Sequence, residues 1–136
     1  MIHGVSVSIP ALLVAALTGF VIGGLWYGPL FRKPWMAASG MSFEKGKQQN
    51  MVLVFGLTYL LNVAMAFGIS MLLGHQHGLL GGAHTGFFAA MVFIAPAIGV
   101  IYLFESRPLK LWLINAGYQV VNAAAMGAVL GIWPWG

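Results

Sequence analysis

The stretch LLGGAHTGFFAAMVFIAPAIGVIYLF, residues 79–104, decides the fold, because it contains no Asp, Glu, Lys or Arg. An α-helix needs about 20 apolar residues to cross the hydrocarbon core of a bilayer, so this run is long enough to span a membrane. No part of it shows the alternating polarity of roughly 10-residue barrel strands. The chain is therefore predicted to be all-α and polytopic, with this span and three other uncharged runs at residues 5–31, 51–73 and 111–133.

The composition is that of an integral membrane protein. Of the 136 residues, 60% are hydrophobic and 6% are charged, whereas soluble domains average about 45–50% and about 25%. A chain of this length forms one domain, residues 1–136, which is too small to bury so much apolar surface in water. The absence of cysteine excludes disulfides, thiol catalysis and thiolate metal sites. The expected partner is the lipid bilayer and not nucleic acid, because the basic residues form no continuous patch.

The placement of the basic residues predicts the topology. With four spans, the first and third loops share one side of the membrane, and the positive-inside rule makes it the cytoplasm. Both termini and the loop around His75 are then expected outside, in the inner membrane of a bacterium. This assignment rests on all six Lys and Arg residues, which are Arg32, Lys33, Lys45, Lys47, Arg107 and Lys110.

The first loop, residues 32–50, is expected to carry a short interfacial helix. Pro34 can open a helix and Ser42 can cap one. Such a helix would hold Trp35 at the level of the lipid headgroups, where tryptophan is enriched. An irregular linker is the alternative.

A two-helix internal repeat is a further hypothesis. The segments at 27–34 and 102–108 both read Tyr, then Leu-Phe, then Arg and Pro. If they are related, the second half of the chain repeats the first about an axis along the membrane normal. Chance similarity between two helix ends would give the same pattern.

Three segments resemble a known family. They are AALTGF at 15–20, LWYGPLF at 25–31 and LKLWLINAGYQ at 109–119, and together they resemble the bacterial domain-of-unknown-function family 1761. The resemblance implies a small four-helix membrane protein and brings no reaction, cofactor or catalytic residue. The family pattern has Ser between Tyr27 and Pro29, where this chain has Gly28.

Small residues recur at four-residue spacing on three of the predicted helices. This spacing places them on one helix face, where small side chains let helices approach closely in lipid. The contact could lie within one chain or between subunits. We expect a homo-oligomer with its interface at Gly19 and Gly23. The other packing glycines are Gly82, Gly86, Gly127 and Gly131.

Polar side chains occupy one face of the second and of the fourth helix. An amide left unpaired in hydrocarbon costs several kcal/mol, so each is expected to face a partner inside the bundle. The group is either a structural zipper or a polar pocket and pathway near the midplane. It comprises Tyr59, Asn62 and Ser70 of the second helix and Asn115, Tyr118, Gln119 and Asn122 of the fourth.

Three histidines form a candidate metal site. His75, His77 and His84 lie near one predicted membrane face, and three imidazoles suit Zn, Cu or Ni. A metal site of this kind is usually accompanied by a carboxylate that orients the rings, and none is nearby.

The function expected from the sequence is that of a non-enzymatic homo-oligomer without a cofactor. The first alternative is a channel or transporter for a small solute, and the second is a metal-dependent membrane enzyme. The two acids, Glu44 and Glu105, lie outside the middle of the spans, which argues against proton coupling through a central carboxylate. A cavity reaching the amides would favour transport, and a dry hydrogen-bonded core would favour a structural role.

Overall fold

The computed structural model describes residues 7–40, 50–74 and 78–134, and within these residues the chain is helical with no strand. Four helical stretches are long and apolar enough to cross a membrane. The predicted all-α fold with four spans is therefore confirmed, and the spans are Ile9–Leu30, Met51–Leu73, Leu79–Phe104 and Leu109–Ile132. The elements are α1 (Ile9–Leu25), η1 (Trp26–Leu30), α2 (Arg32–Ser39), α4 (Met51–Leu73), α5 (Leu79–Ala89), η2 (Ala90–Ile94), α6 (Ala95–Phe104) and α7 (Leu109–Ile132).

Local signals explain where the spans begin. The Ser8 hydroxyl accepts a hydrogen bond from the Ala11 amide at 3.3 Å, and the Asn50 side chain accepts one from the Leu53 amide at 3.2 Å. Both are N-caps of the kind that satisfy the unpaired amides of a first helical turn. The first span consequently begins at Ile9, later than the predicted residue 5, and α7 begins at Leu109, directly after Pro108.

The loop between the first two spans contains the short helix α2, which ends at Ser39 and is followed by Gly40 with a φ of +75°. This helix begins at Arg32, before Pro34, and its place at a membrane interface stays a prediction. Ser42, the other candidate start, lies outside the described residues.

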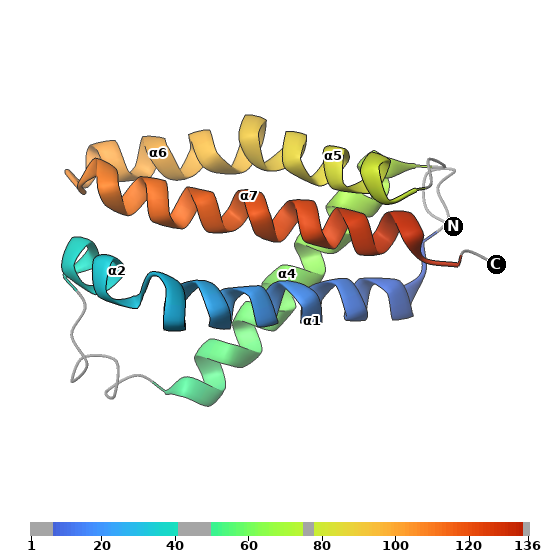
Figure 1. Ribbon diagram of the computed structural model, residues 1–136, viewed down its shortest axis with the longest axis horizontal. Helices are drawn as coiled ribbons and strands as arrows, with labels where there is room; N and C mark the ends of the chain where they lie inside the picture. Colours follow the sequence, from blue (N-terminus) through green and yellow to red (C-terminus); the bar gives the residue numbers. More distant parts are fainter. Residues whose placement is uncertain (1–6, 41–49, 75–77, 135–136) are drawn as a thin grey trace.

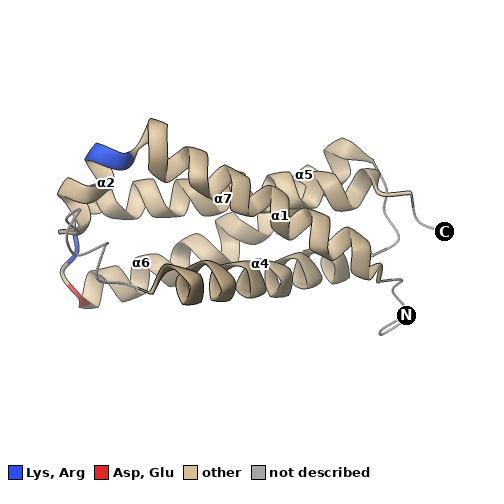
Figure 2. Ribbon diagram, turned by 90° about the horizontal axis from the view of Figure 1, so that it is seen from below, with Lys and Arg blue, Asp and Glu red and all other residues tan. Residues whose placement is uncertain are grey.

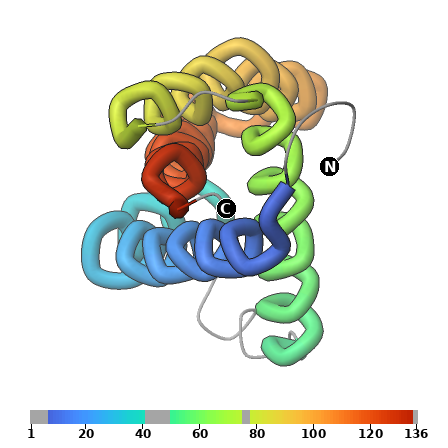
Figure 3. Tube along the Cα trace, turned by 90° about the vertical axis from the view of Figure 1, so that its right-hand side faces the viewer, coloured from blue at the N-terminus to red at the C-terminus, as the bar shows by residue number. Residues whose placement is uncertain are grey.

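The fourth span, α7, is the centre of the molecule. Figures 1 and 3 show α5 and α6 along one side of α7 and α1 along another, with α4 crossing obliquely. The core lies where α1, α4 and α7 meet and is built from small and apolar side chains such as Ala15, Ala66 and Met126. The start of α1 and the end of α7 lie at one end of the bundle (Figure 1). The opposite end, here called the basic end, carries the described Arg and Lys residues (Figure 2).

Two spans contain a π-helical turn that the periodicity of the sequence did not predict. In η1 the amide of Phe31 reaches the Trp26 carbonyl at 2.8 Å, a step of five residues. In η2 the amide of Ala95 reaches the carbonyl of Ala90, again five residues back. Each turn lies beside a proline, Pro29 within η1 and Pro96 directly after Ala95. Because proline has no amide hydrogen, the regular backbone hydrogen-bond pattern of the helix is rearranged there. Such π-turns are frequent at functional sites.

Candidate functional site

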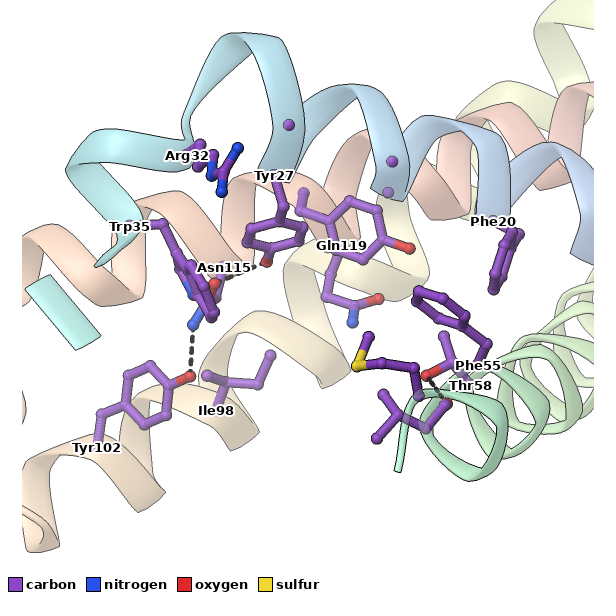
Figure 4. Close-up of a pocket in the computed structure, with 16 residues that line it drawn as sticks. Phe20, Tyr27, Arg32, Trp35, Phe55, Thr58, Ile98, Tyr102, Asn115 and Gln119 are labelled. Atoms are coloured by element: carbon purple, nitrogen blue, oxygen red, sulfur yellow. Dashed lines mark hydrogen bonds between the residues drawn. The ribbon is translucent and has the colours of Figure 1, made fainter. Parts of the chain in front are cut away.

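A cleft of about 940 Å³ lies between α7 and the surrounding helices, in the half of the bundle nearer the basic end (Figure 4). Its apolar walls include Phe20 of α1, Phe55 of α4 and Ile98 of α6. A small number of polar groups interrupts these walls. They are Tyr27, Arg32, Thr58, Tyr102, Asn115, Tyr118 and Gln119.

The cleft exists because α4 diverges from the other helices. Its buried residues begin at Asn62, whereas residues 51–57 are all exposed. Figure 1 shows this N-terminal half of α4 leaving the bundle beneath α1. The cleft therefore fills the wedge between the exposed half of α4 and the pair formed by α6 and α7, with α2 at its outer end.

Three side chains in the wall of the cleft are joined by two hydrogen bonds into a short chain. The Tyr27 hydroxyl donates to Oδ1 of Asn115 at 2.6 Å, and Nδ2 of Asn115 donates to the Tyr102 hydroxyl at 2.7 Å (Figure 4). These bonds join η1, α7 and α6. Because an amide oxygen only accepts and an amide nitrogen only donates, the direction of the chain is determined. The Tyr102 oxygen accepts from Asn115, so its own hydrogen is left to donate.

Two further ring residues support the wall. The Trp26 indole donates to the Ile114 carbonyl at 3.0 Å, and the Tyr118 hydroxyl donates to the Gly19 carbonyl at 3.2 Å. The Tyr27 and Tyr118 rings meet edge to face with centroids 5.3 Å apart. These contacts hold η1 against α7 and position the hydroxyl and amide groups of the cleft.

Gln119 is the lining residue whose hydrogen bonding is incomplete. Its Oε1 atom is buried and has no hydrogen-bond partner among the residues that the structure describes. Figure 4 shows its side chain in the cleft, between α7 and the helices opposite. A buried acceptor of this kind is costly unless a water or a ligand satisfies it.

Asn62 and Asn122 lie one helical turn deeper than the cleft, in the packed core. Nδ2 of Asn122 donates to Oδ1 of Asn62 at 3.3 Å; Asn122 is 0% exposed and Asn62 is 4% exposed. Neither residue lines the cleft. The deepest lining residues are Phe20 on α1, Thr58 on α4 and Gln119 on α7. The predicted polar group is therefore divided into a cleft wall and a buried amide pair.

The remaining two predicted polar residues lie elsewhere, Tyr59 at a partly exposed contact with α1 and Ser70 in the core. The Tyr59 hydroxyl donates to the Leu13 carbonyl of α1 at 2.9 Å. Ser70 is 1% exposed, and its hydroxyl has no hydrogen-bond partner within the described part of the chain. Neither residue lines the cleft.

The packing glycines lie at contacts within the chain. A Cβ atom built on Gly19 would overlap the Asn122 side chain, and one on Gly23 would lie 3.1 Å from the Tyr118 hydroxyl. The prediction that Gly19 and Gly23 form a subunit interface is therefore wrong, because α7 of the same chain already occupies this face. Four other glycines bring the backbones of α5 and α7 together, namely Gly82, Gly86, Gly127 and Gly131.

The candidate metal site cannot be assembled from the described residues. His75 and His77 lie outside them, and His84 is exposed on α5. Over residues 7–40, 50–74 and 78–134, no three His, Cys, Asp or Glu side chains come together in a way that could hold a metal ion.

Sequence reasoning did not assign Tyr27, Tyr102, Arg32 or Trp35 to a site. A signal was available, because Tyr27 and Tyr102 occupy matching places in the Tyr, Leu-Phe, Arg, Pro pattern. The structure brings both hydroxyl groups to the one amide of Asn115. Their convergence could not be derived from spacing alone, since it depends on how the first and third spans flank α7.

Comparison with known proteins identifies a family without a known activity. No curated protein and no solved structure matches this chain. The family model described as "Protein of unknown function (DUF1761)" matches residues 10–131 and covers the segments that suggested the resemblance. The chain therefore belongs to the DUF1761 family of proteins of unknown function.

Proposed function

We propose that this protein is a non-enzymatic membrane carrier that binds a small organic molecule in the cleft. The observation that carries the proposal is the cleft itself, with about 940 Å³ of space, mostly apolar walls and a few polar groups aimed inward. Small-molecule sites typically have volumes of about 300–1,000 Å³ and the same mixture of apolar walls and a few orienting polar groups. The incomplete hydrogen bonding of Gln119 supports the same interpretation.

Binding is favoured over catalysis by the chemistry of the lining. The lining side chains supply hydroxyl, amide and guanidinium groups, and no His, Asp or Glu is among the described residues of the cleft. Hydroxyl and amide groups orient a ligand well, whereas general acid–base catalysis usually relies on imidazole or carboxylate groups.

A carrier is favoured over an open channel by the layer beneath the cleft. Asn62, Asn122 and Gly19 pack together directly below it, and the two amides are buried. Passage across the membrane would therefore need this layer to open during each transport event, as alternating access requires.

The proposal also specifies the membrane and the orientation of the protein in it. The protein would lie in the inner membrane of a bacterium with the basic end in the cytoplasm and both termini outside, in accordance with the positive-inside rule. The cleft would then open toward the cytoplasmic half of the bilayer. A homo-oligomer would have to use outward faces other than that of Gly19 and Gly23, which α7 covers.

Thiol accessibility tests the cleft, and the chain is suited to it because it contains no cysteine. Thr58→Cys places one thiol in the cleft wall, and Leu61→Cys places one on the lipid-facing side of α4, where Leu61 is 67% exposed. A membrane-impermeant maleimide should label Thr58→Cys several times faster than Leu61→Cys, because thiolates form in water and not in lipid. The labelling should occur from the cytoplasmic side of inverted vesicles.

A second substitution tests whether the maleimide reaches Thr58→Cys through the cleft. Gly24 lines the cleft, and a Cβ atom there would meet nothing within 4 Å, so Gly24→Leu should fill the space without disturbing the packing. It should slow the labelling of Thr58→Cys, whereas Gly68→Leu, an equally open glycine away from the cleft, should not. Equal labelling of Thr58→Cys and Leu61→Cys, or no effect of Gly24→Leu, would overturn the proposal.

A further inference from the structure

We infer that the molecule bound in the cleft is an anionic amphiphile with a single hydrocarbon chain, which enters sideways from the bilayer between α4 and α6. This inference rests on the proposed function and adds the class of ligand and its route. It follows from three features: hydrogen-bond donors at the outer end of the cleft, apolar rings at its inner end and the open side left by α4.

The outer end of the cleft offers donors to an anionic headgroup. The direction of the Tyr27–Asn115–Tyr102 chain leaves the Tyr102 hydroxyl hydrogen to donate. Arg32, at the same end, carries five N–H donors and can bind an anion while it keeps another contact. Arg107, whose Cζ atom lies 5.7 Å from the centre of the Tyr102 ring, is paired with Glu105 at 2.9 Å and adds no net charge, so Arg32 is the cation among the described lining residues of this end. No acidic side chain lies among the described residues that line the cleft, so a carboxylate or a phosphate is favoured over an amine.

The inner end of the cleft suits a hydrocarbon chain. The Phe20 and Phe55 rings meet edge to face there, with centroids 5.6 Å apart. Ile98 forms part of the opposite wall, and Met51 and Val54 continue the apolar surface along α4. The charged Arg32 side chain thus lies at the basic end of the cleft, and the Phe20 and Phe55 rings lie toward the middle of the bundle, where Gln119 is also found. An amphiphile lying in one leaflet of a bilayer has the same orientation.

The side of the cleft provides the route. The residues of α4 that line the cleft are themselves exposed, Met51 by 40%, Val54 by 37% and Phe55 by 50%. Together with the divergence of α4 from the bundle in Figures 1 and 3, this exposure indicates that one flank of the cleft is open toward lipid. A volume of about 940 Å³ is at the upper end for small-molecule sites, and it favours one chain over the two chains of a phospholipid.

A photoreactive fatty acid tests the inference. Purified protein in phosphatidylcholine vesicles is irradiated with palmitate that carries a diazirine in its chain, and the labelled residues are mapped by mass spectrometry. We expect labelling to concentrate on residues 20–28 and 51–58, and excess palmitate to suppress it. Arg32→Gln should lower this labelling several-fold. Lys33→Gln, which removes an adjacent exposed cation that does not line the cleft, should leave it unchanged.

Two control probes define the ligand class. A diazirine alkylamine of the same length should label the cleft much less than palmitate, and so should a two-chain phosphatidylcholine with the same diazirine. Equal labelling by the amine would overturn the anionic class, and equal labelling by the phospholipid would overturn the single chain. Labelling spread evenly over lipid-facing residues and insensitive to Gly24→Leu would overturn the inference as a whole. That last result, combined with rapid maleimide labelling of Thr58→Cys, would leave the proposed carrier function standing with a different ligand.

Discussion

At the scale of single residues, each buried amide of the core is only partly hydrogen-bonded. Asn122 donates to Asn62, while Oδ1 of Asn122 and Nδ2 of Asn62 have no conventional partner among the described residues. Gly19 packs directly against Oδ1 of Asn122, at the place where a Cβ atom would lie. A Cα–H···O contact there offers that oxygen weak compensation. A larger residue at position 19 would therefore collide with the Asn122 amide. Through Gly19, Asn62 and Asn122, the helices α1, α4 and α7 contact one another at the same depth in the bundle.

The amide pair gives a prediction about stability. Asn62→Ala, Asn122→Ala and the double variant form a cycle whose coupling energy should be about 0.6 kcal/mol and no more than about 2 kcal/mol, the usual range for hydrogen bonds between membrane helices. The measurement is the free energy of unfolding in mixed micelles. When Asn62→Ala is combined with Thr58→Cys, the rate of maleimide labelling at residue 58 should stay unchanged, since Asn62 does not line the cleft. A coupling energy of zero would show that the two amides do not interact.

At the scale of elements, α5 and α7 form the closest helix contact among the described residues. Cβ atoms built on Gly82 and Gly127 would each overlap the carbonyl of the other, and one on Gly86 would overlap the carbonyl of Ala123. The amide of Gly78 also donates to the Gly131 carbonyl at 2.8 Å. The two helices therefore touch backbone to backbone along several turns, as expected for helices that lack a hydrophobic driving force in lipid.

Neighbouring glycines of α5 provide a matched test of this contact. Gly82→Ala should destabilise the protein by about 1–3 kcal/mol, the usual cost of overpacking, because the atom in the way is a backbone carbonyl that cannot rotate aside. Gly81→Ala should be neutral or stabilising by up to about 1 kcal/mol, since nothing lies within 4 Å of a Cβ atom there and alanine is the better helix former. Unfolding in mixed micelles measures both variants. Equal stability of the two would contradict the contact.

The helices were predictable to different degrees for physical reasons. The lengths of α4 and of the span Leu79–Phe104 follow from their uncharged runs, because hydrocarbon excludes charge. The π-turns could not be predicted, since a proline changes the local ladder without specifying how the chain rearranges. The spacing of Gly82 and Gly86 predicted close packing, but it did not identify α7 as the partner, which depends on the order of helices around the bundle.

At the scale of the whole molecule, the unequal packing of α4 creates the candidate site. Half of this helix is held in the core by Asn62, Ala66 and Ile69, and the other half, residues 51–57, is exposed. The polar residues Tyr59, Asn62 and Ser70 all lie in the second half, but both halves are uncharged and long enough to lie in lipid, so the sequence did not predict that the first half leaves the bundle. A cleft that arises from the angle between helices is a property of the assembled bundle. The polar face of α7 was predictable, whereas its division between cleft and core was not.

The distribution of charge over the whole molecule gives the last prediction. The described basic residues lie at one end of the bundle, where Arg107 pairs with Glu105 at 2.9 Å, and the start of α1 and the end of α7 lie at the other (Figure 2). A reporter that is active only in the cytoplasm should therefore be active when fused after Lys110, in the first turn of α7, because basic segments are retained inside. The same reporter fused to Gly136 should be inactive, since α7 would carry it across the membrane. Activity of the Gly136 fusion with inactivity of the Lys110 fusion would show that the protein has the opposite orientation in the membrane. The cleft would then open toward the outer leaflet.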